Sequence, residues 1–386
     1  MISNAEKEAV WQAYRARRPV RVPVTFGVNV RVVLFDPKWN PRGITFQQYM
    51  TDPAATADIQ IAFMEYLRTY LHQYCDHPTG PQERLDFWVD NQNTYDSAYF
   101  GAPLVFRDGQ VADVEPYLAG AGKGRIFEID IDHPLDNPFV KRCLGRHEGL
   151  KREASRRGTY KGIPLGAGPP GFGFDGHLTI AVNLRGHEML SDLYEDPEYA
   201  RKLMDFIHRG VVIRNRAMAE LFGRKAFVGP GGSFADDSIA LVGPAMYREM
   251  ILPFHRAWYA LWGPGPHSIH LCGDATRHFA TLHRELNVCS FDTGFPVDHG
   301  ALRRELGDDV EIQGGPEVHL LLEAAPEQVY ERTRSILASG VMRGGRFILR
   351  EANNLPPRTP EANLAAMYRC CLEHGRYGNG REPVKS

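Results

Sequence analysis

Long apolar runs, an excess of basic residues and a secretory leader are all missing from this sequence. No apolar run approaches the roughly 20 residues that a membrane-spanning helix requires, so we expect no membrane segment. The N-terminal stretch MISNAEKEAVWQAYRARRPV has charges between its apolar residues, unlike a secretory signal, and we expect a cytoplasmic protein. The 386 residues carry a formal net charge of −2, which argues against a nucleic-acid partner.

Disulfide and nucleotide-binding motifs are missing as well. The six cysteines show no C-x-x-C spacing and are too few for a disulfide framework in a chain of this length. The stretch GPPGFGFDGH, residues 168–177, lacks the GxxxxGKS or GxxxxGKT spacing of a phosphate loop, and no acidic residue follows at the distance typical of a dinucleotide fingerprint. We interpret this stretch as a loop that covers a substrate, with a plain connection as the alternative.

The composition is that of an ordinary globular protein, with 43% hydrophobic and 24% charged residues. The second half alternates between strand and helix patterns, which favours one parallel barrel or one doubly wound sheet. No break in composition indicates a boundary, so we expect a single domain over residues 1–380 and a polar tail over 381–386. Other expected elements are helices at 5–17, 138–157 and 198–222 and strands at 20–26, 226–229 and 346–350.

The clearest candidate for a chemical site is the segment HSIHLCGD, residues 267–274, which reads as a strand followed by a turn. Side chains alternate across a strand, so His270 and Cys272 are expected on one face, where an imidazole and a thiolate can reach one Zn²⁺. The next strand ends at Asp292, which places a carboxylate at a second strand end. The pair supplies only two ligands, and a core strand with a buried cysteine and a hydrogen-bonded histidine is the alternative.

Two adjacent carboxylates, Asp236 and Asp237, follow the strand expected at 226–229. Aspartates after a strand of a parallel fold suggest catalysis, since the carboxyl ends of such strands form the ligand site. The same residues, followed by Ser238, are equally typical of a helix cap. Both interpretations stay open on the sequence.

Several stretches together resemble the uroporphyrinogen decarboxylase superfamily, which includes the cobamide-dependent methyltransferases. The resemblance extends over most of the chain from about residue 85 and is carried by LTIAVNLRGHEMLSDLYEDPEYARKLMDFI (178–207), DDSIALVGPAMYREMILPFHR (236–256), HLCGD (270–274), IQGGPEVHLLLEAAPEQVYERTRSIL (312–337) and GGRFILREANNLPPRTPEANLAAMYR (344–369). This resemblance implies a single (β/α)₈ TIM-type barrel, here with an N-terminal helical extension, and a site at the carboxyl ends of its strands.

The two branches of the superfamily differ in their motifs. The decarboxylases have a basic motif resembling RQAGRY, whereas VTFGVNVRVVLFD (24–36) offers only Arg31 for an acidic tetrapyrrole. The methyltransferases bind zinc through His-x-Cys and a distant cysteine in a segment resembling PGCGIPP. The corresponding segment here is EANNLPP (351–357), in which Asn353 replaces the cysteine and Glu351 offers a carboxylate. The resemblance thus implies Zn²⁺ on His270, Cys272 and Glu351, with Asp292 as a further candidate ligand, or no metal at all.

Three hypotheses follow from the resemblance. The first is a zinc methyltransferase that moves a methyl group between a corrinoid, carried by a separate protein, and a small acceptor such as a thiol or a folate. The second is a metal-free lyase that acts on a carboxylated or aromatic substrate, in which Asp236, Asp237, Asp292 and His270 handle protons and Arg31 or Arg350 holds a carboxylate. The third is a non-catalytic binding protein on the same scaffold. Relatives are often homodimers. The candidate substrate-binding residues, most of them just after strands, are Asn29, Arg31, Asn91, Arg350 and Asn353.

Overall fold

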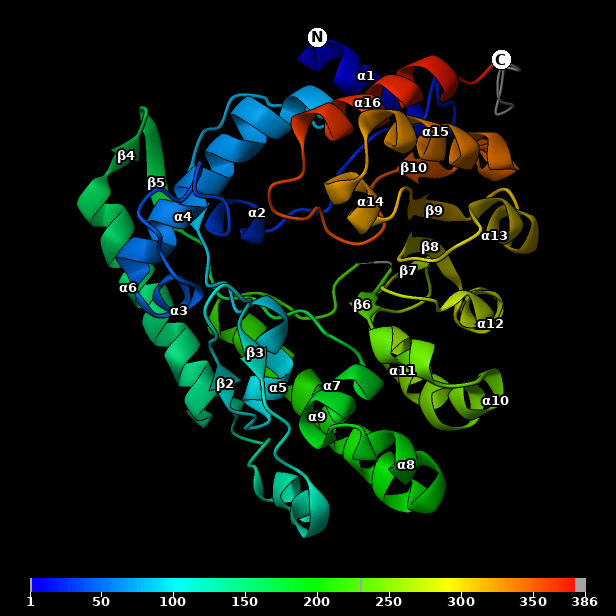
Figure 1. Ribbon diagram of the computed structural model, residues 1–386. Coiled ribbons are helices and arrows are strands. Elements are labelled where there is room, and N and C mark those ends of the chain that lie inside the picture. The colour runs from blue at the N-terminus through cyan, green and yellow to red at the C-terminus, as the bar shows by residue number, and fades with distance from the viewer. Residues whose placement is uncertain (1, 230, 379–386) are drawn as a thin grey trace. The chain divides into compact units, whose positions relative to one another are not determined.

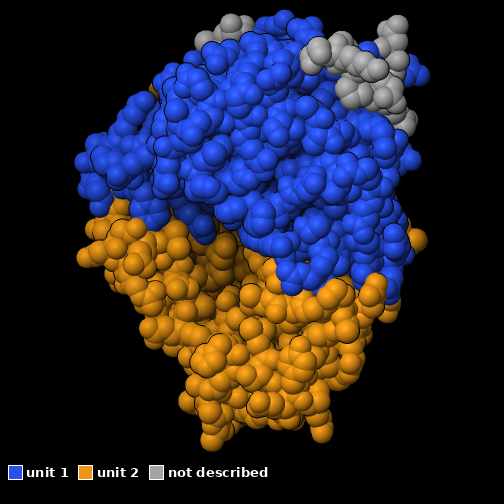
Figure 2. Space-filling model, turned by 45° about the vertical axis from the view of Figure 1, so that its right-hand side comes forward, with its two compact units in different colours: residues 1–43, 61–81, 266–386 blue, residues 44–60, 82–265 orange. Residues whose placement is uncertain are grey.

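The computed structural model describes residues 2–229 and 231–378. The chain forms two compact units, drawn in different colours in Figure 2. Unit 1 comprises Met1–Gly43, Ile61–Pro81 and Pro266–Ser386, and unit 2 comprises Ile44–Gln60 and Gln82–Gly265. The single domain expected over 1–380 stays a prediction, and the polar tail expected at 381–386 lies outside the described residues.

Unit 1 contains a parallel sheet of four neighbouring strands in the order β10–β9–β8–β7. These strands are β7 (His267–Leu271), β8 (Val288–Thr293), β9 (Glu311–Gly314) and β10 (Phe347–Leu349). Helices α12 (Thr276–Leu286), α13 (His299–Leu306) and α15 (Pro326–Ile336) connect successive strands and lie along the sheet (Figure 1). Since parallel neighbours require crossover connections, this alternation establishes an α/β fold. The sheet core is apolar, with Ile269, Phe291, Ile312 and Phe347 buried.

The rest of unit 1 surrounds this sheet. Its other elements are α1 (Asn4–Arg15), α2 (Arg31–Leu34), a π-helical turn at Tyr66–Tyr70, a 3-10 turn at Leu71–Tyr74, α14 (Val318–Glu323), a π-helical turn at Leu337–Val341, a 3-10 turn at Arg343–Gly345 and α16 (Glu361–His374). The expected helix at 5–17 is α1, which begins with a capping box between Ser3 and Glu6.

The strand expected at 20–26 is not a regular strand. The segment is extended beside β10, where Val24 forms an isolated parallel bridge with Leu349 and the Thr25 amide donates to the Leu349 carbonyl at 2.9 Å. Pro23 has no N–H to donate, which interrupts a regular ladder at this point.

Unit 2 is mostly helical. Its helices are α3 (Phe46–Thr51), α5 (Tyr95–Tyr99), α6 (Pro138–Arg157), α7 (His177–Arg185), α8 (Glu188–Glu195), α9 (Pro197–Leu221), α10 (Pro244–Met246) and α11 (Leu252–Ala260). Its 3-10 turns are Gln92–Thr94, Gly120–Glu128, Pro134–Asp136 and Asp237–Leu241, and Tyr247–Ile251 is π-helical. Helix α4 (Pro53–Glu65) belongs to unit 2 through Gln60 and to unit 1 from Ile61.

The strands of unit 2 are short. They are β1 (Leu85–Phe87), β2 (Leu104–Val105), β3 (Asp113–Val114), β4 (Thr159–Tyr160), β5 (Ile163–Ala167) and β6 (Ser233–Ala235). Strands β1 and β5 are parallel, and β2 and β3 are antiparallel. The prediction of a strand at 226–229 was wrong. Phe227 has a φ of +55°, in the left-handed region that strand residues do not adopt, and β6 begins only at Ser233.

No helix among the described residues is both long and apolar enough to cross a membrane.

Candidate active site

The carboxyl ends of β7 and β8 bring three of the expected site residues together in unit 1. The parallel register pairs His270 with Asp292, and the Asp292 Oδ2 lies 2.7 Å from Nδ1 of His270. The other ring nitrogen, Nε2, lies 3.1 Å from Sγ of Cys272. His270 and Asp292 keep 28% and 20% of their side-chain surface exposed, so the group is accessible. The imidazole therefore bridges a carboxylate and a thiol.

The end of β10 adds an arginine and a second carboxylate to this group. Arg350 Nη1 donates to the same Asp292 Oδ2 at 2.6 Å, and Nη2 donates to Oε1 of Glu351 at 2.9 Å and to the carbonyl of Asn353. The amide of Gly27 donates to the same Glu351 oxygen at 2.8 Å. Arg350 was expected to hold a substrate carboxylate, but its guanidinium is already paired with two carboxylates of the chain.

The surroundings shift the pKa values of two of these groups. Burial alone would lower the pKa of His270, but the hydrogen bonds to Asp292 and Cys272 and their charges raise it to about 10. Burial raises the pKa of Glu351 to about 8, against the opposing effect of Arg350. In the absence of a bound cation, both groups therefore tend to keep their protons at neutral pH.

The donor set of this group fits zinc in part. Asp292 fixes Nδ1 of His270, which directs Nε2 to the side of Cys272, as the outer-shell carboxylate of a zinc-bound histidine does. A tetrahedral zinc with bonds of about 2.05 Å to nitrogen and 2.3 Å to sulfur separates these ligand atoms by about 3.6 Å. The observed separation of 3.1 Å is shorter, so the two side chains would have to move apart by about 0.5 Å to hold the ion.

The third ligand expected from the sequence is not in position. Glu351 is fully buried, and its Oε1 is engaged by Arg350 and Gly27. No described His, Cys, Asp or Glu of unit 1 joins His270 and Cys272 in a set of three whose ligand atoms all lie within 4.8 Å of one another. Glu351 would have to leave Arg350 in order to complete such a set.

Asp236, expected as a catalytic residue, lies at the centre of a buried hydrogen-bond network in unit 2. Its Oδ1 accepts from the amide and the hydroxyl of Thr179, both at 2.8 Å, and its Oδ2 accepts from the Leu178 amide at 3.1 Å and from Nε2 of His255 at 2.9 Å. The two amides belong to the first turn of α7, which begins with no side-chain cap of its own. Asp236 thus caps α7 from a distance of 58 residues along the chain.

The glycine that precedes α7 makes room for this cap. Gly176 has a φ of +84°, and a Cβ there would lie 2.3 Å from the carbonyl oxygen of Ala235 and from the Cβ of Asp236. On the other side, the hydroxyl of Tyr247 lies 3.0 Å from Nδ1 of His255. With its side-chain oxygens accepting four hydrogen bonds and no exposed surface, Asp236 is arranged to hold structure.

Buried histidines surround the same carboxylate. His177, Asp236 and His255 have ligand atoms within 4.8 Å of one another, and all three are buried. Nε2 of His177 lies 3.0 Å from Nδ1 of His208, and burial holds the pKa of His177 well below its usual range. Because the oxygens of Asp236 are already occupied, this cluster is a hydrogen-bonded core and not an open metal site.

The remaining expected residues make local contacts. Asn29 accepts from the amide of Arg31 at 3.0 Å at the start of α2, and Arg31 is half-buried. Asn91 is buried and accepts from Arg146 at 2.8 Å, which fastens it to α6. Asn353 has a φ of +118°, a conformation that is strained for any residue other than glycine. Asp237 is half-buried.

Sequence reasoning missed a second group of carboxylates in unit 2. Tyr95 donates to Asp175 Oδ1 at 2.7 Å, the Asp175 amide donates to Asp96 at 2.9 Å, and the buried Asp96 pairs with the buried Arg214 at 2.8 Å. Burial and the charge of Asp96 hold the pKa of Asp175 well above its usual range, which makes it a candidate proton donor. The only signal was its place in the glycine-rich stretch 168–177.

Comparisons with known proteins fit this architecture. A family model described as uroporphyrinogen decarboxylase (URO-D) matches residues 175–374, more than half of the chain. The chain therefore belongs to the uroporphyrinogen decarboxylase family, which confirms the resemblance seen in its sequence.

Two methyltransferases are among the similar proteins. The curated "Methylated-thiol--coenzyme M methyltransferase" of Methanosarcina mazei is 30% identical over 199 residues, which are 51% of this chain and 51% of that protein. This chain thus matches about half the length of that relative. The solved structure of a methyltransferase from Methanosarcina mazei has a TM-score of 0.64 and 14% identity, and the match covers 95% of this chain and 98% of that one. The likeness to this structure shows a common fold.

Proposed function

We propose that this chain is a methyltransferase that moves a methyl group between a corrinoid, held by a separate protein, and a small thiol or folate acceptor. The observation that carries the proposal is the pair of Nε2 of His270 and Sγ of Cys272 at 3.1 Å, with Asp292 behind the imidazole. The family match and the methyltransferase names of the two relatives support the reaction class. In this proposal the α/β fold closes as an eight-stranded barrel, and the protein is a cytoplasmic homodimer.

In this proposal His270 and Cys272 hold Zn²⁺, and Glu351 becomes the third ligand. The metal, when bound, would keep an acceptor thiol in its thiolate form at neutral pH. Asp292 orients the imidazole through Nδ1, and Arg350 in turn orients Asp292 at 2.6 Å. Glu351 must leave Arg350 to reach the metal. While it is buried its pKa is about 8, so binding of the cation and loss of the Glu351 proton favour one another.

Metal content tests the zinc site directly. We expect elemental analysis of the purified wild-type protein to find about one zinc per chain. We expect Cys272→Ser to bind zinc at least tenfold more weakly, since a serine hydroxyl is a much poorer ligand than a thiolate. Cys289→Ser is the matched control, because Cys289 is also half-buried and hydrogen-bonds Asn287 at 3.3 Å. Asp292→Asn is expected to weaken zinc about 10–100-fold as an outer-shell change.

Two outcomes decide the assignment. Zinc retained unchanged in Cys272→Ser would contradict the ligand set. If zinc is lost in Cys272→Ser but retained in Glu351→Gln, His270 and Cys272 remain as ligands and Glu351 is excluded from the ligand set. Methyl transfer from methyl-cobamide to a thiol, measured with the zinc-loaded protein, then tests the reaction itself.

A metal-free lyase is the second candidate, favoured by the hydrogen-bond partners at both nitrogens of His270. In that case His270 transfers the proton and Asp292 orients it. Full turnover of a carboxylated substrate after strong chelation, with no bound metal, would support this function over methyl transfer. A non-catalytic binding role would show as tight ligand binding with no turnover by either assay.

A further inference from the structure

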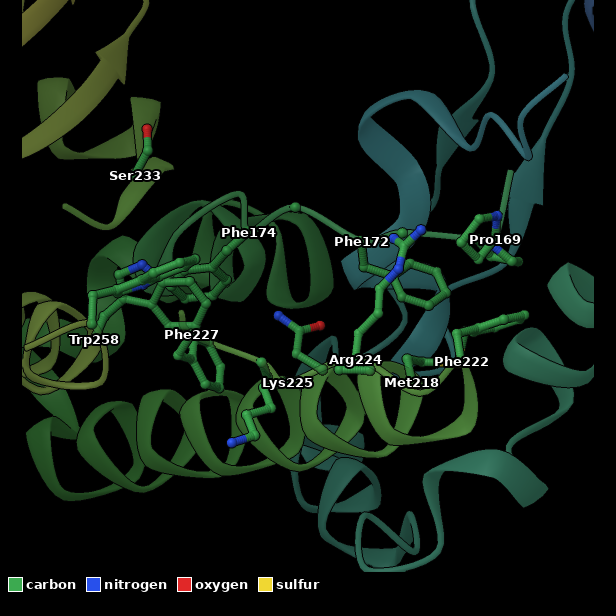
Figure 3. A pocket seen from close by; sticks show the side chains of 17 residues that line it. Pro169, Phe172, Phe174, Met218, Phe222, Arg224, Lys225, Phe227, Ser233 and Trp258 are labelled. Carbon is green, nitrogen blue, oxygen red and sulfur yellow. The ribbon is translucent and has the colours of Figure 1, made fainter. Parts of the chain in front are cut away.

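Unit 2 contains a pocket of about 330 Å³ that none of the proposed chemistry uses. Part of its wall is the glycine-rich stretch 168–177, and the rest comes from the end of α9, the connection to β6 and the end of α11 (Figure 3). Its size suits a ligand of one or two rings. The large apolar side chains of its lining are Phe172, Phe174, Met218, Phe222, Phe227, Trp258 and Trp262.

The wall is aromatic and closely packed at one end. The rings of Phe174 and Trp258 have centroids 4.2 Å apart, and Phe227 meets Trp258 and Trp262 edge-on at 5.5 and 5.4 Å. Figure 3 shows Phe174, Phe227 and Trp258 gathered together. Phe227 makes these contacts from a left-handed backbone conformation with a φ of +55°, which a phenylalanine adopts only when its surroundings impose it.

The two tryptophans bring unsatisfied hydrogen-bond donors to this wall. The indole Nε1 atoms of Trp258 and Trp262 are buried and have no hydrogen-bond partner among the described residues. A buried donor without a partner destabilises a fold, so such a group calls for an explanation. The hydrogen bonds of this wall are therefore not completed by the described part of the chain itself.

The rim of the pocket is cationic. Arg224 and Lys225 line the pocket and are exposed, and no hydrogen bond or ion pair occupies either side chain within the part of the chain that the structure describes. No described residue of the lining is acidic. The two side chains point to different sides in Figure 3, and both are long and exposed, so either can turn toward a negative charge at the mouth while a ring lies against the aromatic wall.

We propose that this pocket binds a small aromatic acid of one or two rings, with its ring against Phe174 and Phe227 and its carboxylate at Arg224 or Lys225 on the cationic rim. The proposal concerns unit 2 alone and does not depend on zinc or on methyl transfer. It gives the glycine-rich stretch 168–177 a ligand-binding role distinct from the site at His270.

Calorimetric titration of the full chain with 2-naphthoate tests this pocket, with 2-naphthylmethanol as the uncharged ring and cyclohexanecarboxylate as the charged non-aromatic ring. We expect saturable binding of one 2-naphthoate per chain and much weaker binding of cyclohexanecarboxylate. The double variant Arg224→Gln/Lys225→Gln should weaken 2-naphthoate roughly tenfold and leave 2-naphthylmethanol within about twofold. Arg18→Gln/Arg304→Gln, at two exposed arginines of unit 1, makes the same charge change and should alter neither ligand.

A pocket-filling variant keeps the test decisive. Ala219 lies half-buried in the lining on α9, and Ala219→Phe should abolish binding of both aromatic ligands while circular dichroism shows an unchanged fold. Absence of 2-naphthoate binding to the wild type, or binding that survives Ala219→Phe, would overturn the proposal. Loss of 2-naphthoate binding in Cys272→Ser would also overturn it, because that result would place the ligand at the strand ends of unit 1.

Discussion

Asp236 can be interpreted as a helix cap or as a catalytic residue. The cap predicts that its replacement lowers stability, whereas the catalytic interpretation predicts a loss of activity at unchanged stability. Replacement by alanine removes the acceptor of two helix amides, one hydroxyl and the Nε2 proton of His255. The hydrogen bonds from Leu178 and His255 are buried, and those from Thr179 are partly buried. Loss of a helix cap alone costs about 1 kcal/mol. Removal of one partner from a buried, charged network costs about 3–5 kcal/mol.

We therefore expect Asp236→Ala to lower the free energy of unfolding by about 3–5 kcal/mol. Asp236→Asn should cost less, about 1–3 kcal/mol, because one oxygen still accepts and His255 can exchange its tautomer through the Tyr247 hydroxyl at 3.0 Å. Asp205→Ala is the matched control: Asp205 is 60% exposed and pairs with Arg209 at 3.4 Å, so its loss should cost less than about 0.5 kcal/mol.

Urea unfolding followed by tryptophan fluorescence measures these differences, since Trp258 belongs to the same unit and is buried. The expected order of stability is wild type, then Asp236→Asn, then Asp236→Ala. A stability of Asp236→Ala within about 1 kcal/mol of wild type would refute the capping argument. If activity were lost at that unchanged stability, the catalytic interpretation would replace it.

Two further expectations concern unit 1. A Cβ on Gly294 would lie 2.4 Å from the Gly273 amide nitrogen and 2.8 Å from the backbone of Cys272. Gly294→Ala should therefore lower the free energy of unfolding in urea by about 2–4 kcal/mol. Gly80→Ala is the control, because a Cβ there meets no atom within 4 Å and should change the stability little. Equal effects of the two would contradict the close approach. Burial lowers the pKa of His299 to about 4, below the value near 6.5 that a histidine has in an unfolded chain. Between these two values the unfolded chain binds a proton that the folded chain does not, so the stability falls as the pH drops from 6.5 toward 4. The stability advantage of wild type over His299→Gln should therefore shrink by about 2 kcal/mol between pH 7.5 and pH 5, and a constant difference would contradict the burial of a neutral imidazole.

Local patterns were informative where one element determines the result. The helices expected at 138–157 and 198–222 are α6 and α9, and the strand expected at 346–350 is β10, since each has its own periodicity and end signals. The segments at 20–26 and 226–229 misled because β-branched and apolar residues also occur in extended or turned chain. The missing N–H of Pro23 and the left-handed backbone of Phe227 decide those cases, and neither is visible in a pattern of hydrophobic residues.

The sequence by itself determined the alternation of strands and helices, the family and the pairing of His270 with Cys272, because two positions on one strand end share a face whatever surrounds them. Only the tertiary structure decided the partners of the carboxylates. Asp236 finds its helix 58 residues away, and Arg350 finds Asp292 at the same separation of 58 residues. A carboxylate at a strand end has the same sequence signature whether it caps a helix, orients a histidine or transfers a proton. Its function is fixed by the donors that folding brings to it.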